Sequence, residues 1–115
     1  PPAIGAWEMA SKTNWQRCEI QAELISALAH PIRIAIADLL REGEVCVCEI
    51  AERIGVERSN TSRHLAIMHK AGVVTTRKQG LQVFYSLRTP CVLDMLHCAT
   101  QAVEQDLADR SKALA

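Results

Sequence analysis

The feature that most constrains this chain is a pair of helical patterns on either side of Gly55-Val56. Residues 49–54 have the apolar spacing of a two-turn helix, and residues 58–71 have that of a longer helix closed by Gly72. Glycine is the residue that most readily ends a helix in a left-handed conformation. Two short helices around so tight a turn are the arrangement of a helix-turn-helix.

A β-hairpin is expected directly after this unit. Residues 73–76 and 82–87 are rich in β-branched and aromatic side chains, and the intervening segment 77–81 is basic and contains a glycine. This pattern predicts two antiparallel strands with Arg77 and Lys78 at the tip of their connection.

The rest of the chain is mainly helical. A first helix is expected from Trp15, Pro31 starts a second helix that Gly43 ends, and Thr89-Pro90 precedes a last one. With a short β-branched stretch at 45–48, the order becomes helix, helix, strand, helix, helix, hairpin, helix. The predicted fold is therefore mainly α with a small β-hairpin, a winged helix-turn-helix.

The second helix of the unit has the side chains of a DNA-reading helix. The formal net charge of the chain is zero, but cations dominate from Glu57 to Gly80. Short polar and basic side chains on the first turns of such a helix meet base edges and phosphates in the major groove. We expect double-stranded operator DNA to be contacted by Arg58, Ser59, Asn60, Thr61, Ser62, Arg63, His64, Arg77 and Lys78. A polar helix start and a solvated hairpin would give the same composition.

The last helix is expected to join two copies of the chain. One helix-turn-helix touches few base pairs, so operator binding usually needs two reading helices about 34 Å apart. The apolar stripe from Val92 through Leu107 lies beyond the hairpin, where the core has little room to cover it. This predicts a homodimer through the terminal helices. The alternative is that the last helix folds back onto the core of its own chain. The predicted organisation is a flexible arm (1–14), a DNA-binding and dimerisation domain (15–110) and a tail (111–115).

The five cysteines are interpreted as reduced thiols. No apolar run approaches the roughly 18 residues of a membrane span, and the N-terminus lacks the pattern of a signal peptide. A cytoplasmic chain without membrane contact is expected, and there cysteines serve metal binding, redox chemistry or the core.

Cys46 and Cys48 form the strongest candidate ligand pair. On a strand, residues two apart face one side, so both sulfurs would point to one ion. Thiolates suit As(III) and Sb(III), and also Cd, Pb, Zn and Cu(I). Trivalent arsenic prefers three thiolates, for which Cys91, Cys98 and Cys18 are candidates. Cys91 is preferred because it follows the outgoing hairpin strand, which is expected to pair with residues 45–47. Two core cysteines remain the alternative.

Four motifs in order resemble the ArsR/SmtB metal-sensing repressors. They are Leu28-Ala-His-Pro-Ile-Arg-Ile34, Glu44-Val-Cys-Val-Cys-Glu-Ile50, Ser62-Arg-His-Leu65, and Ala71 to Arg77 continued by Val83 to Leu87. The resemblance covers about residues 20–107. It implies a winged-helix dimer that represses a resistance or efflux operon and leaves DNA when its inducer binds. The Cys46-Val-Cys48 motif looks like the thiolate site of the arsenic-responsive and the cadmium- or lead-responsive branches.

The sequence departs from the family pattern at three places. The third cysteine of the arsenical type is replaced by Ala51, so that ligand must come from elsewhere. Asp94 and His97 are spaced differently from the ligands of the zinc- and cobalt-sensing branch, which argues against that site. Glu57 stands where a Ser or Thr cap is usual.

The function expected from the sequence is a metal(loid)-responsive transcriptional repressor rather than an enzyme. As(III) or Sb(III) is the expected inducer, with Cd, Pb or Zn as further options. One alternative keeps the fold and makes the cysteines redox or sulfide sensors. The other is a thiol enzyme or metal carrier without a DNA partner, for which no convincing catalytic set is visible.

Overall fold

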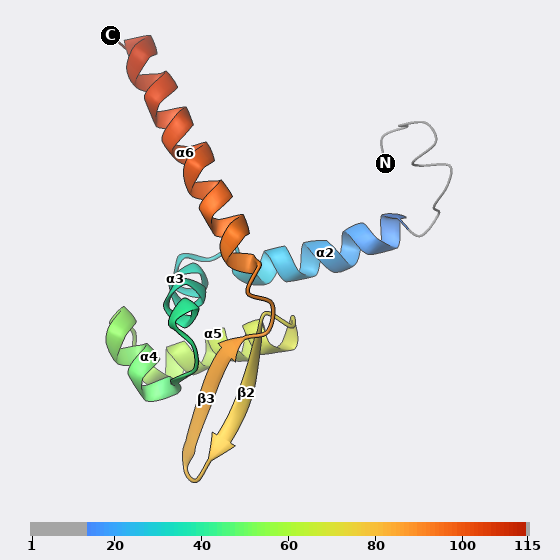
Figure 1. Cartoon of the computed structure of the whole chain (residues 1–115), viewed down its shortest axis with the longest axis vertical. Coiled ribbons are helices and arrows are strands. Elements are labelled where there is room, and N and C mark those ends of the chain that lie inside the picture. Colours follow the sequence, from blue (N-terminus) through green and yellow to red (C-terminus); the bar gives the residue numbers. More distant parts are fainter. Residues whose placement is uncertain (1–13, 115) are drawn as a thin grey trace.

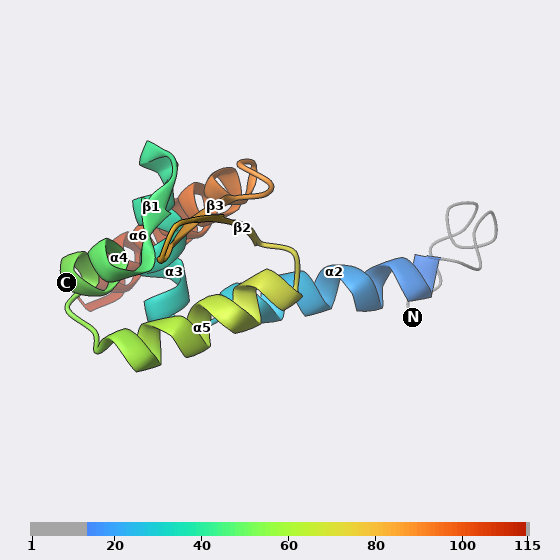
Figure 2. The ribbon, with the colours of Figure 1, turned by 90° about the horizontal axis from the view of Figure 1, so that it is seen from below.

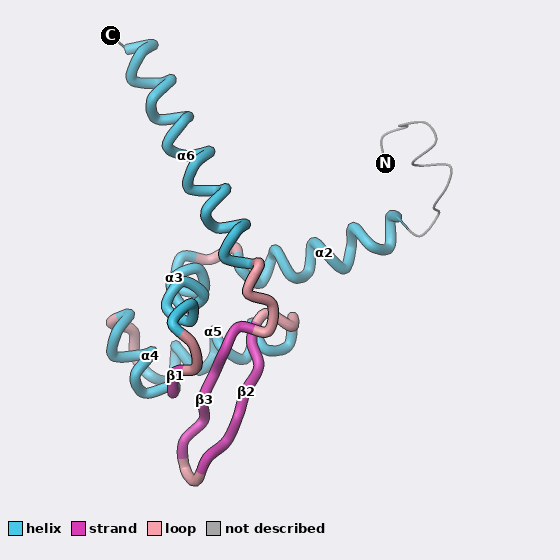
Figure 3. The backbone as a smooth tube through the Cα atoms, in the orientation of Figure 1, coloured by secondary structure: helices cyan, strands magenta, loops and turns pink. Residues whose placement is uncertain are grey.

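The structure, a computed structural model, describes residues 14–114 and is mainly helical with one small sheet. Figures 1 and 3 show the central helices gathered at the root of a β-hairpin, while the first and last described helices extend away from this cluster. In chain order the elements are α2 (Asn14–Leu28), α3 (Pro31–Leu39), the 3₁₀ turn η1 (Leu40–Glu42), β1 (Val45–Cys46), α4 (Val47–Ile54), α5 (Arg58–Lys70), β2 (Val74–Gln79), β3 (Gln82–Leu87) and α6 (Val92–Leu114). This confirms the predicted fold class.

The ends of the chain bear on the predicted organisation only in part, because residues 1–13 and 115 lie outside the described residues. The arm expected at 1–14 lies outside the described residues except for Asn14, which begins α2. At the other end, α6 continues through residues 111–114, where a tail was expected. Near this end of α6, Arg110 is paired with Asp106 one turn earlier at 3.0 Å.

The core lies where α3, α4, α5 and the root of the hairpin meet. Its fully buried side chains come from every one of these elements and from the first residue of α6: Ile36, Ile50, Leu65, Met68, Val73, Val74 and Val92. Removing such a side chain from water stabilises a fold by about 1.5–3 kcal/mol. The reading helix is thus fixed to the molecule by its own apolar face, through Leu65 and Met68.

Local signals define the ends of the helices. His30 caps α3, its Nδ1 accepting a hydrogen bond from the backbone N–H of Ile32 at 3.1 Å. Gly55 ends α4 with φ +71°, and its N–H donates to the carbonyl of Ala51 at 3.0 Å. Helix α5 begins after Glu57, whose side chain makes no capping hydrogen bond.

The sheet has the order β1-β3-β2, with all neighbours antiparallel. The expected pairing of the first strand with the outgoing hairpin strand is confirmed, since Val45 faces Tyr85 and Cys46 faces Phe84. The hairpin turns at Gly80, with φ +62°, and at the fully exposed Leu81. A glycine of positive φ in the first position of a two-residue turn matches the twist of the strands.

Two sequence expectations about this region were wrong. Arg77 and Lys78 lie inside β2 rather than at the hairpin tip, because the strand continues to Gln79. The cysteine pair does not lie on one strand either: β1 ends at Cys46, which is the extended N-cap of α4, and Cys48 belongs to the first turn of that helix. The helix starts early because Val47 and Ile50, three residues apart, both turn into the core.

Helices α2 and α6 are largely uncovered. Trp15 and Ile20 on α2 are 54% and 64% exposed, and Val103 and Leu107 on α6 are 58% and 57% exposed. Only the ends of these helices nearest the core contact it. Within the described part of the chain, no helix has both the length and the apolarity to cross a membrane.

Candidate nucleic-acid interface and thiol site

The first turns of α5 present a polar and basic surface. Figure 2 shows this helix on the outside of the molecule, and Arg58, Ser59, Ser62 and Arg63 are exposed on it. Arg63 Nη2 donates to Asn60 Oδ1 at 3.1 Å, an arrangement that holds the half-buried amide beside the cation. Contact of these exposed side chains with base edges and phosphates stays a prediction from the sequence.

Thr61 is turned inward and is a correction to the predicted contact set. Its side chain is fully buried, and its Oγ1 donates to the carbonyls of Glu57 at 3.0 Å and Val56 at 3.4 Å. Thr61 therefore ties α5 to the turn that precedes it, and it has no surface with which to touch DNA.

His64 is likewise engaged within the protein. Its ring is half-buried, its centroid lies 4.5 Å from that of His30, and its Nδ1 accepts a hydrogen bond from Arg33 Nε at 3.1 Å. Arg33 also donates to the carbonyl of Ala27 at 3.4 Å, so one guanidinium connects α2, α3 and α5. Sequence reasoning missed Arg33, since a helix pattern alone does not indicate which arginine faces a histidine thirty-one residues later.

The pKa of His64 lies below its ordinary value. Desolvation is the main cause, and the nearby charges of His30, Arg33 and Arg63 act in the same direction. A neutral imidazole can accept the hydrogen bond from Arg33, whereas a protonated one cannot. The hydrogen bond and the lowered pKa therefore support each other.

The two predicted basic residues of the hairpin differ in their surroundings. Lys78 is exposed on β2. The guanidinium of Arg77 forms a double hydrogen bond with the carboxylate of Glu44, from Nε at 2.9 Å and from Nη2 at 2.6 Å. Sequence reasoning missed this pairing, because the strand register that brings Arg77 beside Glu44 is not visible in the sequence.

Three candidate thiols lie at or just before the starts of α4 and α6 and do not form a complete metal site. Cys46 is half-buried at the N-terminus of α4 and Cys48 is exposed in its first turn, while Cys91 is exposed just before α6. Across residues 14–114, no three or more His, Cys, Asp or Glu side chains are grouped so as to hold a metal ion. The structure therefore does not bring Cys91 together with the pair within one protomer.

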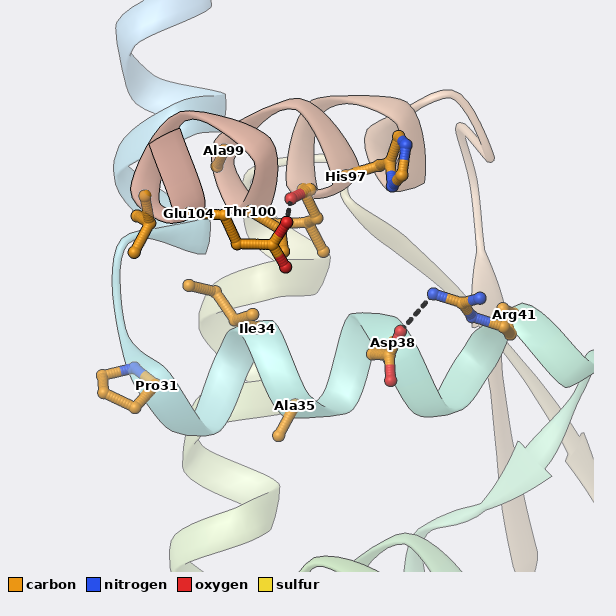
Figure 4. Close-up of a pocket in the computed structure, with 11 residues that line it drawn as sticks. Pro31, Ile34, Ala35, Asp38, Arg41, His97, Ala99, Thr100 and Glu104 are labelled. Atoms are coloured by element: carbon orange, nitrogen blue, oxygen red, sulfur yellow. Dashed lines mark hydrogen bonds and ion pairs between the residues drawn. The ribbon is translucent and has the colours of Figure 1, made fainter. Parts of the chain in front are cut away.

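A groove of about 740 Å³ runs between α3 and α6 (Figure 4). Apolar side chains of both helices line it, including Ile34 and Val103, which are 40% and 58% exposed. Asp38, paired with Arg41, lies at one end of the groove. An open apolar groove beside an uncovered helix is a surface on which another chain can pack.

Comparisons with known proteins agree with this geometry. Residues 30–76 match the bacterial regulatory proteins of the arsR family. The HTH-type transcriptional regulator Rv0081 of Mycobacterium tuberculosis is 36% identical over 97 residues, which are 84% of this chain and 85% of the relative. The HTH-type transcriptional repressor SmtB of the same species is 46% identical over 65 residues, 56% of this chain and 48% of the repressor.

Two solved structures have the same fold. The crystal structure of Rv0081 superposes with a TM-score of 0.71 at 35% identity, covering 87% of this chain and 98% of that one. The homodimeric winged helix-turn-helix DNA-binding domain of Mb0332 from Mycobacterium bovis gives a TM-score of 0.73 at 26% identity, covering 84% and 90%. With its helix-turn-helix, its wing and these relatives, the chain belongs to the arsR family of bacterial regulatory proteins and is a DNA-binding transcriptional repressor.

Proposed function

We propose that this repressor is a thiol sensor that binds operator DNA as a homodimer and releases it when a soft metal or metalloid binds Cys46 and Cys48. The observation that carries the proposal is the place of the pair at the start of α4. This helix packs directly on α5, because Ile50 of α4 and Leu65 of α5 belong to one buried cluster. A change at the thiols is thus one helix away from the DNA-reading surface.

The proposed dimer uses the uncovered faces of α2 and α6. Each chain leaves Val103 and Leu107 facing water along α6, together with the groove against α3. A second copy would cover these side chains, and the Mb0332 domain of the same fold is a homodimer. Two copies of α5 would then face successive turns of the major groove.

The proposed inducer chemistry is ligand exchange at a trivalent centre. In arsenous acid each thiol replaces one hydroxide, and the thiol proton leaves with that hydroxide as water. Cys46 and Cys48 supply two sulfurs, and we keep Cys91 as the proposed third. Because Cys91 is not grouped with the pair in the described chain, its binding requires a rearranged or an assembled state. Cd, Pb or Zn would be held by the same thiolates.

Movement at the start of α4 is the proposed route to induction. Val47 is buried between the two cysteines, so drawing both sulfurs onto one ion disturbs a core side chain. A coupling of about 1–3 kcal/mol between ion and DNA is enough for a 5- to 150-fold change in affinity.

The test is a DNA-binding titration of the reduced protein on a duplex taken from upstream of its own gene. Arsenite and cadmium are added in separate series, and the Kd for DNA is measured by fluorescence anisotropy. We expect the inducing ion to raise Kd at least tenfold for the original chain. The double variant Cys46→Ser/Cys48→Ser should bind DNA normally and no longer respond.

Further variants separate the roles of the remaining cysteines. Cys91→Ser should weaken the response to arsenite, whereas Cys98→Ser, on the exposed part of α6, is the matched control and should respond normally. If the double serine variant still releases DNA when arsenite is added, Cys46 and Cys48 are not the sensor site. Release by an oxidant alone, reversed by a dithiol, would instead favour the redox alternative.

A further inference from the structure

The carboxylate of Glu44 pairs with Arg77, the arginine of the hairpin. All three nitrogens of the Arg77 guanidinium are used: Nε and Nη2 donate to the Glu44 carboxylate, and Nη1 donates to Gln79 Oε1 at 2.8 Å. The same guanidinium lies over the ring of Phe84, 4.8 Å from its centroid. A carboxylate and a phosphate present similar paired oxygens to arginine, so one guanidinium fork cannot serve both fully.

Both partners keep their charges. The hydrogen bond from Arg77 holds the pKa of Glu44 below its ordinary value, and the hydrogen bond to Glu44 raises the pKa of Arg77. Their side chains are nevertheless 36% and 50% exposed. Exposed ion pairs are weak because water and salt screen them, so an incoming phosphate can displace the carboxylate.

The ion pair joins the hairpin to the cysteine segment. Strand β3 lies between β1 and β2, and its Phe84 is paired in register with Cys46 of β1 and with Arg77 of β2. Glu44 stands two residues before Cys46, immediately outside β1. The carboxylate is therefore attached to the segment proposed to respond to the inducer, while the guanidinium is attached to the hairpin.

We propose that Glu44 competes with DNA phosphate for Arg77, so that the carboxylate sets how much the hairpin contributes to DNA binding. In the free protein the pair leaves Lys78 as the hairpin cation without a carboxylate partner among the described contacts. On DNA, a phosphate accepts some of the hydrogen bonds that the Arg77 guanidinium otherwise donates to Glu44. The competition itself rests on DNA binding alone, and only its link to the cysteines rests on the proposed function.

The first test measures DNA binding of the full reduced chain with no metal or metalloid present. Glu44→Gln removes the charge with little change of shape, and we expect a two- to fivefold lower Kd, about the strength of an exposed pair. The gain should be largest at low salt. The lower Kd should disappear when Glu44→Gln is combined with Arg77→Gln, because there is then no guanidinium for carboxylate and phosphate to compete for.

The matched control is Glu42→Gln. Glu42 is also exposed, lies two residues away and is paired with a different arginine, Arg53, at 2.9 Å. If general charge explains the gain, both glutamine variants will tighten DNA binding equally, and the proposal fails. It also fails if Glu44→Gln leaves Kd unchanged or raises it, the result expected of a pair that only stiffens the hairpin. Circular dichroism checks that each variant is folded.

A second arm adds arsenite to the same variants. If the pair connects the thiols to the hairpin, the arsenite-dependent rise in Kd should be smaller in Glu44→Gln than in Glu42→Gln. An equal rise in the two variants overturns the connection and leaves the competition standing. Absence of any arsenite response in the original chain would contradict the proposed function but not the result of the first test.

Discussion

At Thr61 and His64, the reading helix uses polar side chains to hold itself in place. Thr61 is fully buried and bonds back to the carbonyls before the helix, and His64 accepts a hydrogen bond from Arg33 on α3. Their neighbours Ser62 and Arg63 point to solvent. Alternation of this kind lets one short segment carry both anchoring side chains and exposed polar ones, since successive helical positions lie about 100° apart.

Acid should destabilise the protein through His64. Its pKa is lowered in the folded chain, mainly by desolvation, while in the unfolded chain it returns to about 6.5. The contribution of His64 is therefore fully present above about pH 6.5. As the pH falls through that value toward the lower folded pKa, the unfolded state takes up the proton first and stability is lost. Urea unfolding between about pH 8 and pH 5 measures this slope.

Two variants isolate the effect of this histidine from that of other acid groups. His64→Gln should show a shallower loss of stability with falling pH than the original chain. His97→Gln, which removes an exposed histidine on α6, should keep the original slope. Equal slopes for both variants would show that another group is responsible.

At the scale of single elements, Gly55 sets how α4 turns into α5. Its φ of +71° is in the left-handed region, and a Cβ built there would meet nothing within 4 Å. Gly55→Ala should therefore cost only the backbone term, about 1–2 kcal/mol of unfolding free energy. Asparagine tolerates this conformation better, so Gly55→Asn should cost less. A urea midpoint unchanged by alanine would mean that the turn relaxes to another conformation.

Most elements could be predicted because their signals are local. Gly43, Gly55 and Gly72 end the helical patterns near the expected positions, and Pro31 starts α3 as expected. The two local errors concern residues 45–48, where helix and strand compete, and residues 77–78, where strand and turn compete. Val47 was assigned to a strand from its β-branched side chain, but packing beside Ile50 decided for a helix.

The candidate site was less predictable, because partners far apart in the sequence decide it. The exposed positions Arg58, Ser62 and Arg63 followed from the residue types alone. The pairing of Arg77 with Glu44 depends on the register of three strands, and no nearby residue signals it. Whether Cys91 reaches Cys46 and Cys48 stays a prediction, since it concerns a rearranged or assembled state.

At the scale of the whole molecule, the described chain is open rather than compact. Its radius of gyration is 17.9 Å, against about 13 Å for a compact 100-residue domain. The difference comes from α2 and α6, which extend from the core in Figure 1. Helices of this kind need a second surface, because isolated helices are marginal in water.

Placing a charge on the uncovered face of α6 should break the dimer. Leu107→Glu puts a carboxylate at a 57% exposed site, so the single chain should remain folded while its association and its DNA affinity fall. Gln101→Glu adds the same charge at another exposed position of the helix and serves as control. Sedimentation velocity measures the association. A dimer that survives Leu107→Glu unchanged would place the contact elsewhere.

Because α2 and α6 are uncovered in a single chain, the stability of the protein should depend on its concentration. Side chains that one chain leaves in water are buried only when a second chain arrives, so folding of α2 and α6 and association are linked by mass action. Dilution then acts like a mild denaturant on these helices, while the buried cluster around Ile36 and Leu65 is held within each chain. At low concentration the repressor should dissociate from its operator before its core unfolds.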